Sequence, residues 1–468
     1  MKIIMGGGLT GLAASYQLSN NSVPSLILER GSILGGLART FNSGGFRYDL
    51  GGHRLLTSNR WVEQLFRELL GDHLLEVERK SQILLNGRYF HYPLRPLNAI
   101  RGFGTATSLK ILKDFLTEKT RGLYHQRPNL SLQDWVTSNF GRSLFEIYFR
   151  DYSEKVWGIG CNQISSEWVA KRIQGISLWK AIRTAITRMR KPQELTLSDR
   201  FYYPLEGIGE LPRAILKATP HARLEINTEV VEIYHSERRI TGLTVMTPGG
   251  LRRVKGSGYI STIPVTTLLR SLRPVPPEEI MNEAREVKYR DLIVVVVMLR
   301  QDRVTDLNWL YIPQKTVPFG RIHEPGNWSP IMSPPGKTHL VVEYFTSRGE
   351  DLWEMSDWAL ESLTTYHLEK LGIINSKNVI GTETRRVSHA YPVFDLDYKK
   401  RMRKITTYLS GFHNLILAGR TGGFEYLNMD EAILSGIAAA ERLVGLPHGE
   451  STINITDHLI PRGEEIRL

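Results

Sequence analysis

Cysteine is almost absent from this sequence: Cys161 is the single one among 468 residues. A disulfide within the chain needs two cysteines, and thiolate-based zinc or iron–sulfur sites need several, so all of these are excluded. Long hydrophobic runs are absent too. The longest, residues 292–299, is too short to cross ~30 Å of hydrocarbon as a helix and is typical of a buried strand. The first motif begins almost at Met1 and leaves no room for a signal peptide, so we expect a cytoplasmic protein.

Acidic residues are fewer than basic ones: 48 Asp and Glu stand against 60 Lys and Arg, a formal net charge of +12. This excess indicates an anionic partner, whether a nucleotide, a phosphorylated metabolite, a lipid surface or nucleic acid. No recognised nucleic-acid motif accompanies the charge, so we expect no nucleic-acid partner. Basic residues at 180–191 are interleaved with apolar ones, a pattern found more often on a solvated face than in a peripheral membrane contact.

The N-terminal residues predict a dinucleotide-binding site. Residues 2–5 form a short apolar strand that runs into a G-x-G-x-x-G at Gly6, Gly8 and Gly11, and a small-residue helix follows. A second strand ends in Glu29. The glycines let the backbone approach a pyrophosphate, the helix N-terminus supplies N–H donors, and Glu29 can bind ribose hydroxyls. These elements in this order favour a bound dinucleotide over a glycine-rich turn without a ligand.

The residues that follow indicate which dinucleotide it is. The run 35–40 reads Gly-Gly-Leu-Ala-Arg-Thr, and Asp-Leu-Gly-Gly-His stands at 49–53. This order resembles FAD proteins of the glutathione-reductase type, particularly their amine oxidase-like branch. The resemblance implies that Arg39 contacts the FAD pyrophosphate and that the Gly-Gly-His segment passes beside the isoalloxazine ring.

The C-terminal part resembles the last FAD motif of the same family. A strand at 414–417 ends in a turn, and a helix with small residues on one face begins near Asn428. In the family this helix dipole points at the flavin and stabilises its reduced, anionic form. A strand over 224–233 resembles the one near the adenine. The resemblance implies non-covalent FAD bound by Gly6, Gly8, Leu9, Thr10, Gly11, Glu29, Arg30, Gly36, Leu37, Arg39, Gly51, Gly52, His53, Val230, Gly419, Arg420, Asn428 and Met429.

We therefore expect an α/β fold with a FAD-binding, Rossmann-like domain interrupted by substrate-binding insertions. Strand and helix patterns divide the chain into a FAD-binding domain (1–95, 215–270 and 375–447), a mainly helical insertion (96–214), a mixed β-sheet insertion (271–374) and a tail (448–468). Apolar residues at three- and four-residue spacing over 144–156 are more often core than active site.

A narrower resemblance is to the UDP-galactopyranose mutases, especially the eukaryotic kind. It is carried by residues 149–158, 167–173, 203–209 and 389–392 together with the Gly-Gly-His segment. In that family two arginines clamp the UDP diphosphate, and the matching positions are Arg172 and Arg321. Arginine suits this role because it forms paired hydrogen bonds to phosphate and keeps its charge. The resemblance further implies catalytic roles for His53 and Asn428 beside the flavin, and substrate contacts by Trp168, Tyr391 and Tyr426.

Two other interpretations share these motifs. One is a FAD-dependent oxidase or desaturase of the protoporphyrinogen oxidase or amine oxidase type, which would use oxidised flavin and an apolar cleft. The other is a non-catalytic binder like the Rab GDP-dissociation inhibitors, against which the intact Glu29 and Arg39 argue. No Ser-His-Asp, Cys-His or metal-ligand pattern is present, so no metal is expected. Because there is one dinucleotide fingerprint, NAD(P)H, if used as reductant, would visit the substrate cleft transiently.

Overall fold

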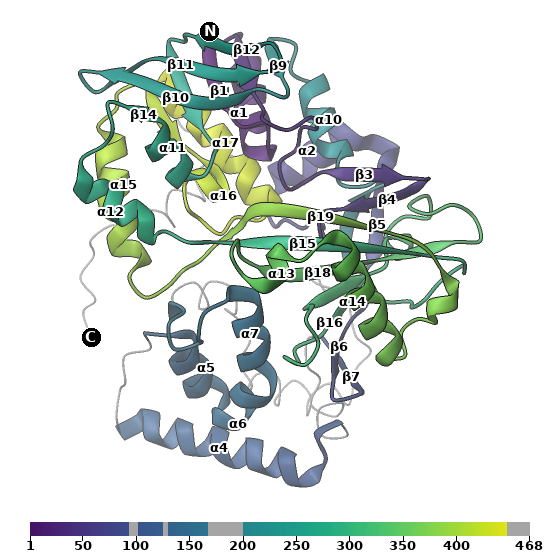
Figure 1. Ribbon diagram of the computed structural model, residues 1–468. Coiled ribbons are helices and arrows are strands. Elements are labelled where there is room, and N and C mark those ends of the chain that lie inside the picture. Colours follow the sequence, from purple (N-terminus) through teal and green to yellow (C-terminus); the bar gives the residue numbers. More distant parts are fainter. Residues whose placement is uncertain (93–101, 125–129, 167–199, 447–468) are drawn as a thin grey trace.

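The computed structural model describes residues 1–92, 102–124, 130–166 and 200–446 (Figure 1). Its first sheet is parallel throughout, in the order β20-β13-β1-β2-β9. The strands come from three distant parts of the chain: β1 (Lys2–Met5), β2 (Ser25–Leu28), β9 (Ala222–Glu225), β13 (Gly258–Ser261) and β20 (Leu415–Leu417). The central strands are almost entirely buried, as expected for a parallel sheet covered on both faces. The predicted α/β, Rossmann-like fold class is confirmed.

Helices cover one face of this parallel sheet, and a second sheet covers the other (Figure 1). Ile4 and Ile27 share a core with residues of the helices α1 (Leu9–Asn20), α10 (Glu210–Lys217) and α17 (Met429–Val444). Ile3 and Leu26 point the opposite way, toward the sheet β12-β11-β10-β14. That sheet consists of β10 (Glu229–Ser236), β11 (Arg239–Thr247), β12 (Gly250–Val254) and β14 (Leu272–Arg273).

The expected single strand over 224–233 is wrong, because β9 ends at Glu225 and β10 begins at Glu229. Asn227, between them, has φ 49°. The backbone N–H groups of Asn227 and Thr228 donate to the carbonyls of Gly31 (3.0 Å) and Glu29 (2.8 Å). The turn therefore fastens the end of β2 to the second sheet, a contact between distant segments that local strand propensity does not reveal.

A separate seven-stranded sheet has the strand order β19-β15-β18-β17-β16-β6-β7. Its strands are β6 (Ser81–Leu85), β7 (Arg88–His91), β15 (Tyr289–Leu299), β16 (Trp309–Tyr311), β17 (Arg321–His323), β18 (Thr338–Thr346) and β19 (Val379–Pro392). The expected buried strand at 292–299 is confirmed as part of β15. The predicted domain boundaries stay a prediction, but β6, β7 and β19, assigned by sequence to the FAD-binding domain, pair within this sheet.

Two smaller antiparallel pairs and several helices complete the described chain. The pairs join β3 (Thr40–Ser43) to β4 (Phe46–Asp49) and β5 (Leu74–Glu78) to β8 (Arg200–Pro204). Besides α1, α10 and α17, the longer helices outside the helical insertion are α2 (Arg60–Leu70), α11 (Val265–Ser271), α12 (Glu278–Glu286), α14 (Asp357–Lys370) and α15 (Tyr398–Ser410). Two short helices are α13 (Asp351–Glu354) and α16 (Gly419–Gly422). Within the described ranges, no helix combines the length and apolar character needed to span a membrane.

Four helices of the predicted helical insertion lie at the bottom of Figure 1, away from the parallel sheet. They are α4 (Thr105–Tyr124), α5 (Leu132–Phe140), α6 (Arg142–Leu144) and α7 (Arg150–Trp157). A π-helical turn, Phe145–Phe149, separates α6 from α7. Leu144 and Phe145 are buried as expected, whereas Tyr152 is only half-buried. Because a π-turn widens the helix by one residue, the 3.6-residue pattern shifts there, and part of the expected core stripe faces elsewhere.

Candidate functional site

A cavity of about 350 Å³ opens beyond the carboxyl ends of β1 and β2, the edge at which parallel sheets bind ligands. Every predicted cofactor residue lines it except Gly11, Gly51 and Gly52. The two glycine-rich loops meet at its floor: the N–H of Gly35 donates to the carbonyl of Gly7 (2.7 Å). The Glu29 carboxylate is fixed by the backbone N–H groups of Gly7 (2.8 Å) and Gly31 (2.7 Å).

Gly11 does not line the cavity, and its predicted contact with the cofactor stays a prediction. A Cβ at this position would lie 2.1 Å from the carbonyl oxygen of Gly6. Gly11 therefore allows α1 to pack closely on the end of β1, the role of the third glycine in such a motif. Gly436 likewise allows α17 to pack closely on α1, since a Cβ at Gly436 would lie 2.1 Å from the carbonyl oxygen of Thr10.

Gly51 and Gly52 also lie outside the cavity lining, and their predicted contact with the cofactor stays a prediction. Gly51 has φ 90°, and a Cβ there would lie 2.8 Å from Oε2 of Glu343. A Cβ at Gly52 would lie 2.2 Å from Nε1 of Trp309. The two glycines let the chain pass against Glu343 and Trp309, and this close passage brings the next residue, His53, to the cavity wall.

The cavity fits the dinucleotide that the sequence predicts. Arg39 lines it, and the Nε of Arg39 is buried without a hydrogen-bond partner. The N-terminus of α1 has no side-chain cap, so its backbone donors are available to an anion. The N-terminus of α17, with Asn428 as N-cap, reaches the same cavity. An uncapped helix end and an unpaired buried guanidinium nitrogen are the donors that a pyrophosphate requires.

His53 is neutral at physiological pH. Burial, and then the positive charge of Arg420, lower its pKa to about 4. Its Nδ1 lies 3.1 Å from the carbonyl oxygen of Gly51. Because a carbonyl only accepts, Nδ1 carries the proton and Nε2 is left as an acceptor. His53 therefore offers an acceptor to an N–H group and no positive charge to an anionic flavin.

Next to His53 lies a group of four residues that we call the arginine–tyrosine cluster: Arg321, Tyr391, Arg420 and Tyr426. The two tyrosine rings are nearly parallel (17°), with centroids 6.2 Å apart. The Arg420 guanidinium lies 5.4 Å from the Tyr391 centroid and 5.0 Å from that of Tyr426. Arg321 Nη2 donates to the hydroxyl of Tyr391 (3.1 Å). Three predicted substrate residues thus come together with Arg420 of the cavity wall.

Arg321 is also paired with Glu343, whose side chain is fully buried. Burial raises the pKa of Glu343, but the charge of Arg321, with a smaller contribution from the neighbouring His323, outweighs it and holds this pKa at about 2. The Nε of Arg321 is buried without a hydrogen-bond partner, so the guanidinium keeps a donor for a ligand. The site therefore holds a permanently ionised arginine–glutamate pair.

Trp168 and Arg172, the other predicted substrate residues, lie outside the described residues. Within the described ranges, no group of His, Cys, Asp or Glu is arranged to hold a metal ion. The sequence prediction missed Glu343 and His389; His389 lines the cavity with φ 58°. One sequence signal could have indicated Glu343: it is the lone carboxylate in β18, a strand in which every residue is buried.

The fold and this cavity define a dinucleotide-binding flavoprotein. The family model described as flavin containing amine oxidoreductase matches residues 9–444, so the chain belongs to that family. The family implies FAD as cofactor and makes the protein a FAD-dependent enzyme.

Comparisons with individual proteins give two kinds of relative. Protoporphyrinogen oxidase 2, chloroplastic/mitochondrial, of Arabidopsis thaliana is 20% identical over 94% of this chain and 93% of its own length. The mitochondrial protoporphyrinogen oxidase of Nicotiana tabacum is 21% identical over 96% and 95%. Among solved structures, reduced UDP-galactopyranose mutase superposes with a TM-score of 0.84 at 21% identity, covering 98% of this chain and 96% of that one. At this identity the structural likeness shows a shared fold.

Proposed function

We propose that this protein is a mutase that interconverts the pyranose and furanose forms of a nucleotide sugar with the help of reduced FAD. The observation that carries this proposal is the arginine–tyrosine cluster beside His53. Two guanidinium groups and two stacked phenol rings offer charge for a diphosphate and a flat surface for the groups it joins. The likeness of the fold to UDP-galactopyranose mutase supports the same proposal.

Each part of the site has a distinct task in this proposal. Glu29 would hold the FAD ribose, and Arg39 with the N-terminus of α1 would hold the pyrophosphate. When bound and reduced, FAD supplies the electron pair that opens the sugar for ring exchange, with no net loss of electrons. Arg321 and Arg420 would stabilise the negative charge of the departing diphosphate, and Trp168 and Arg172 would complete the substrate-binding set.

The neutral His53 gives the site a preference between flavin states. Its Nε2 accepts hydrogen bonds, and flavin N5 carries a hydrogen only when reduced. We therefore propose that His53 favours the reduced cofactor as an acceptor rather than as a cation. Since the sequence holds one dinucleotide fingerprint, we propose NAD(P)H as a reductant that visits the substrate cleft transiently.

The second candidate is a FAD-dependent oxidase of the protoporphyrinogen oxidase type. It is favoured by the curated relatives, which match over nearly the whole chain. Such an enzyme would work with oxidised flavin and would consume one acceptor for each product. A cluster of two arginines and two tyrosines, of which Arg420 lines the cavity, fits an anionic substrate better than an apolar one.

The two candidates are separated by an electron count. The enzyme is incubated under anaerobic conditions with a panel of UDP- and other nucleotide sugars, and the products are separated by chromatography. If the protein is a mutase, a sub-stoichiometric dose of dithionite should support many turnovers on one of these sugars. Activity confined to the oxidised enzyme, with oxygen consumed in proportion to product, would transfer the proposal to the oxidase.

A substitution of Arg321 also tests whether the substrate is a nucleotide sugar. Arg321→Lys keeps the charge beside Glu343 but loses the planar, paired donors, so we expect UDP to bind about tenfold more weakly while FAD content stays unchanged. Arg213→Lys is the matched control, because Arg213 is exposed and its contact with Glu206 (3.7 Å) lies outside the cluster. Equal UDP affinity in Arg321→Lys and wild type would count against a nucleotide-sugar substrate.

A further inference from the structure

Lys155 of α7 places its ammonium group among four backbone carbonyls of one loop. The loop is residues 312–320, which connects β16 to β17. Nζ of Lys155 donates to the carbonyl oxygens of Ile312 (2.8 Å), Gln314 (2.7 Å), Val317 (2.8 Å) and Phe319 (3.0 Å). We call these four carbonyls the carbonyl cage. All four acceptors thus belong to one short segment and converge on a single cation.

This arrangement needs a small cation at its centre. An ammonium has three hydrogens, so at least one is shared among the four acceptors. Four carbonyl dipoles that point at one another repel unless a positive charge lies between them. Rings of backbone carbonyls in ion channels surround monovalent cations and replace their hydration shell. Lysine suits the cage because its charge is compact, whereas the planar guanidinium of arginine spreads its donors too widely.

The carbonyl cage lies directly before Arg321 in the chain. Phe319 supplies its last carbonyl, and Gly320 alone separates Phe319 from Arg321. The N–H of Gly320 donates to the backbone carbonyl of Glu343 (2.9 Å), and the N–H of Ile312 donates to the carbonyl of Gly320 (2.9 Å). The position of the caged loop therefore sets how Arg321 enters the site beside Glu343.

The same helical turn also supports the aromatic half of the arginine–tyrosine cluster. The Trp157 ring packs against Tyr391 (centroids 6.4 Å apart) and Tyr426 (6.2 Å). The backbone carbonyl of Val156 accepts a hydrogen bond from Nε of the buried Arg290 (3.2 Å). Lys155 stands two residues before Trp157, so α7 contacts Arg321's loop with one side chain and the tyrosines with another.

We propose that Lys155 is a positioning residue: by filling the carbonyl cage, it ties the loop that carries Arg321 to the helix that supports Tyr391 and Tyr426. The functional part of this inference rests on the proposed binding of a nucleoside diphosphate group. The tie itself belongs to the backbone of 312–320 and can be measured without any ligand.

The test uses Lys155→Met in the full-length, FAD-loaded protein. Loss of the ammonium leaves four carbonyls pointing at one another, so hydrogen–deuterium exchange of residues 312–323 should accelerate about tenfold or more, and UDP affinity should fall about tenfold. FAD content should stay unchanged, because Lys155 does not line the cofactor cavity. In Lys155→Ala, whose short side chain leaves the Nζ position open, added ammonium chloride should restore slow exchange, and tetramethylammonium chloride at equal concentration should not.

Lys315→Met is the matched control. Lys315 belongs to the same loop and pairs with Glu154 of α7 (2.6 Å), but its side chain is 56% exposed, so its ion pair contributes little. Exchange and UDP affinity should stay close to wild type in Lys315→Met. If Lys155→Met fails to fold, Lys155→Gln, which keeps amide donors without the charge, takes its place in the same measurements.

Three results would overturn the proposal: unchanged exchange of 312–323 in the Lys155 variant, accelerated exchange that ammonium does not reverse in Lys155→Ala, or accelerated exchange with unchanged UDP affinity. If UDP binds neither the variant nor the wild type, the proposed nucleotide-sugar function fails, and exchange together with its rescue by ammonium still decides whether Lys155 holds the loop.

Discussion

Two carboxylates near the Gly-Gly-His segment, Asp49 and Glu343, are both buried, and their pKa values are shifted in opposite directions. Asp49 is 2% exposed and stands two residues before Gly51. Glu343 is 0% exposed and lies against Gly51 and Gly52. Burial raises the pKa of Asp49 to about 7, whereas Glu343 is held at about 2. Equal burial therefore does not decide whether a carboxylate is charged.

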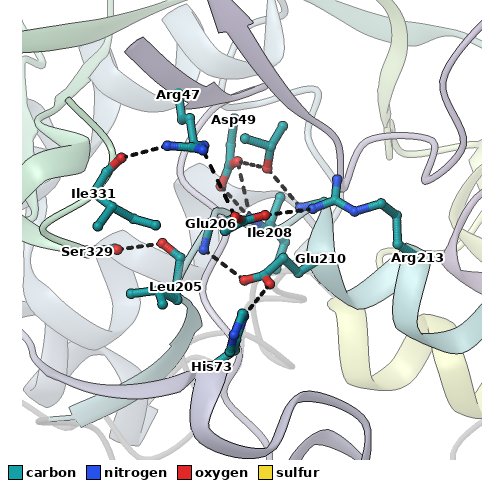
Figure 2. Close-up of polar contacts among 12 residues, drawn as sticks. Arg47, Asp49, His73, Leu205, Glu206, Ile208, Glu210, Arg213, Ser329 and Ile331 are labelled. Carbon is teal, nitrogen blue, oxygen red and sulfur yellow. Dashed lines mark hydrogen bonds and ion pairs between the residues drawn. The ribbon is translucent and has the colours of Figure 1, made fainter. Parts of the chain in front are cut away.

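The partners of Asp49 are all neutral. Its oxygens accept hydrogen bonds from the hydroxyls of Thr40 (2.6 Å) and Tyr203 (2.6 Å) and from the N–H of Ile208 (3.3 Å). Figure 2 shows that the charged groups nearby, Glu206 and Glu210 among them, pair with other residues. Neutral donors offset only part of the cost of burying a charge, so the proton is held more tightly than in water.

The direct partner of Glu343 is a cation, Arg321, whereas burial lowers the pKa of His323 and leaves its imidazole neutral at pH 7. Arg321 pairs with it directly, and Nδ1 of His323 lies 3.8 Å from its Oε1. A positive charge in contact favours the ionised form more strongly than burial disfavours it. The comparison shows that neutral hydrogen-bond donors leave the pKa of a buried acid raised, whereas a contacting arginine lowers the pKa of an equally buried one.

The largest expected effect is that of Glu343→Gln. It removes the counter-charge of a buried arginine, which costs about 3–5 kcal/mol of unfolding free energy. The folded-state pKa of Glu343 is lowered, so its stabilisation is complete above pH 4.5 and is lost as the pH falls toward 2. Denaturant unfolding should show a difference between wild type and variant that is constant from pH 5 to 8 and shrinks below pH 4.5. A difference under 1 kcal/mol at pH 7 would show that the pair is not the source of the site's stability.

Asp49→Asn should have a smaller effect with the opposite pH dependence. At pH 5 the wild-type side chain is protonated, and asparagine keeps most of its hydrogen bonds, so we expect a loss of about 1 kcal/mol. The folded-state pKa of Asp49 is raised, so its contribution falls as the pH rises from about 4 to 7. The wild type should therefore lose its advantage over the variant across that range. A wild-type advantage that grows with pH would mean that Asp49 is ionised in the fold.

Tyr203→Phe should have the smallest effect of the three. It removes one hydroxyl donor from Asp49 and leaves the ring packed against Trp328 (centroids 5.0 Å apart). We expect a loss of about 0.5–1.5 kcal/mol, measured by thermal or denaturant unfolding. Since this hydroxyl lowers the pKa of Asp49, the stability change described for Asp49 should move to higher pH in the variant. An unchanged pH profile would remove Tyr203 from the account of this carboxyl group.

The sequence predicted the glycine-rich half of the site well, because that half is local. The backbone of three glycines, Gly6, Gly8 and Gly36, lines the cavity in loops close to strands. Such local loop geometry can be predicted from a short sequence motif. The ionised pair is not local. Arg321 meets Glu343 because β17 pairs with β18 in that register, and no rule of spacing gives the register of strands before their sheet is known.

The failed expectation of one strand over 224–233, and the packing role of Gly51 and Gly52, have a related reason. The turn at 226–228 exists because Asn227 and Thr228 bond to the end of β2, and Gly51 and Gly52 are required by side chains from distant strands. In each case contacts between distant segments determine the local backbone, and a local sequence motif does not reveal such contacts.

The order of strands in the parallel sheet has a consequence for when the protein can acquire its cofactor. β1 is synthesised first, yet it needs β13 on one side, and β13 needs β20 from near residue 415. The wall of the cavity formed by α17 is synthesised later still. A ribosome-bound chain therefore carries the glycine loops long before it has a pocket, and non-local pairing of this kind is slow to form. We expect FAD to be captured after synthesis, as one of the last events of folding rather than as its template.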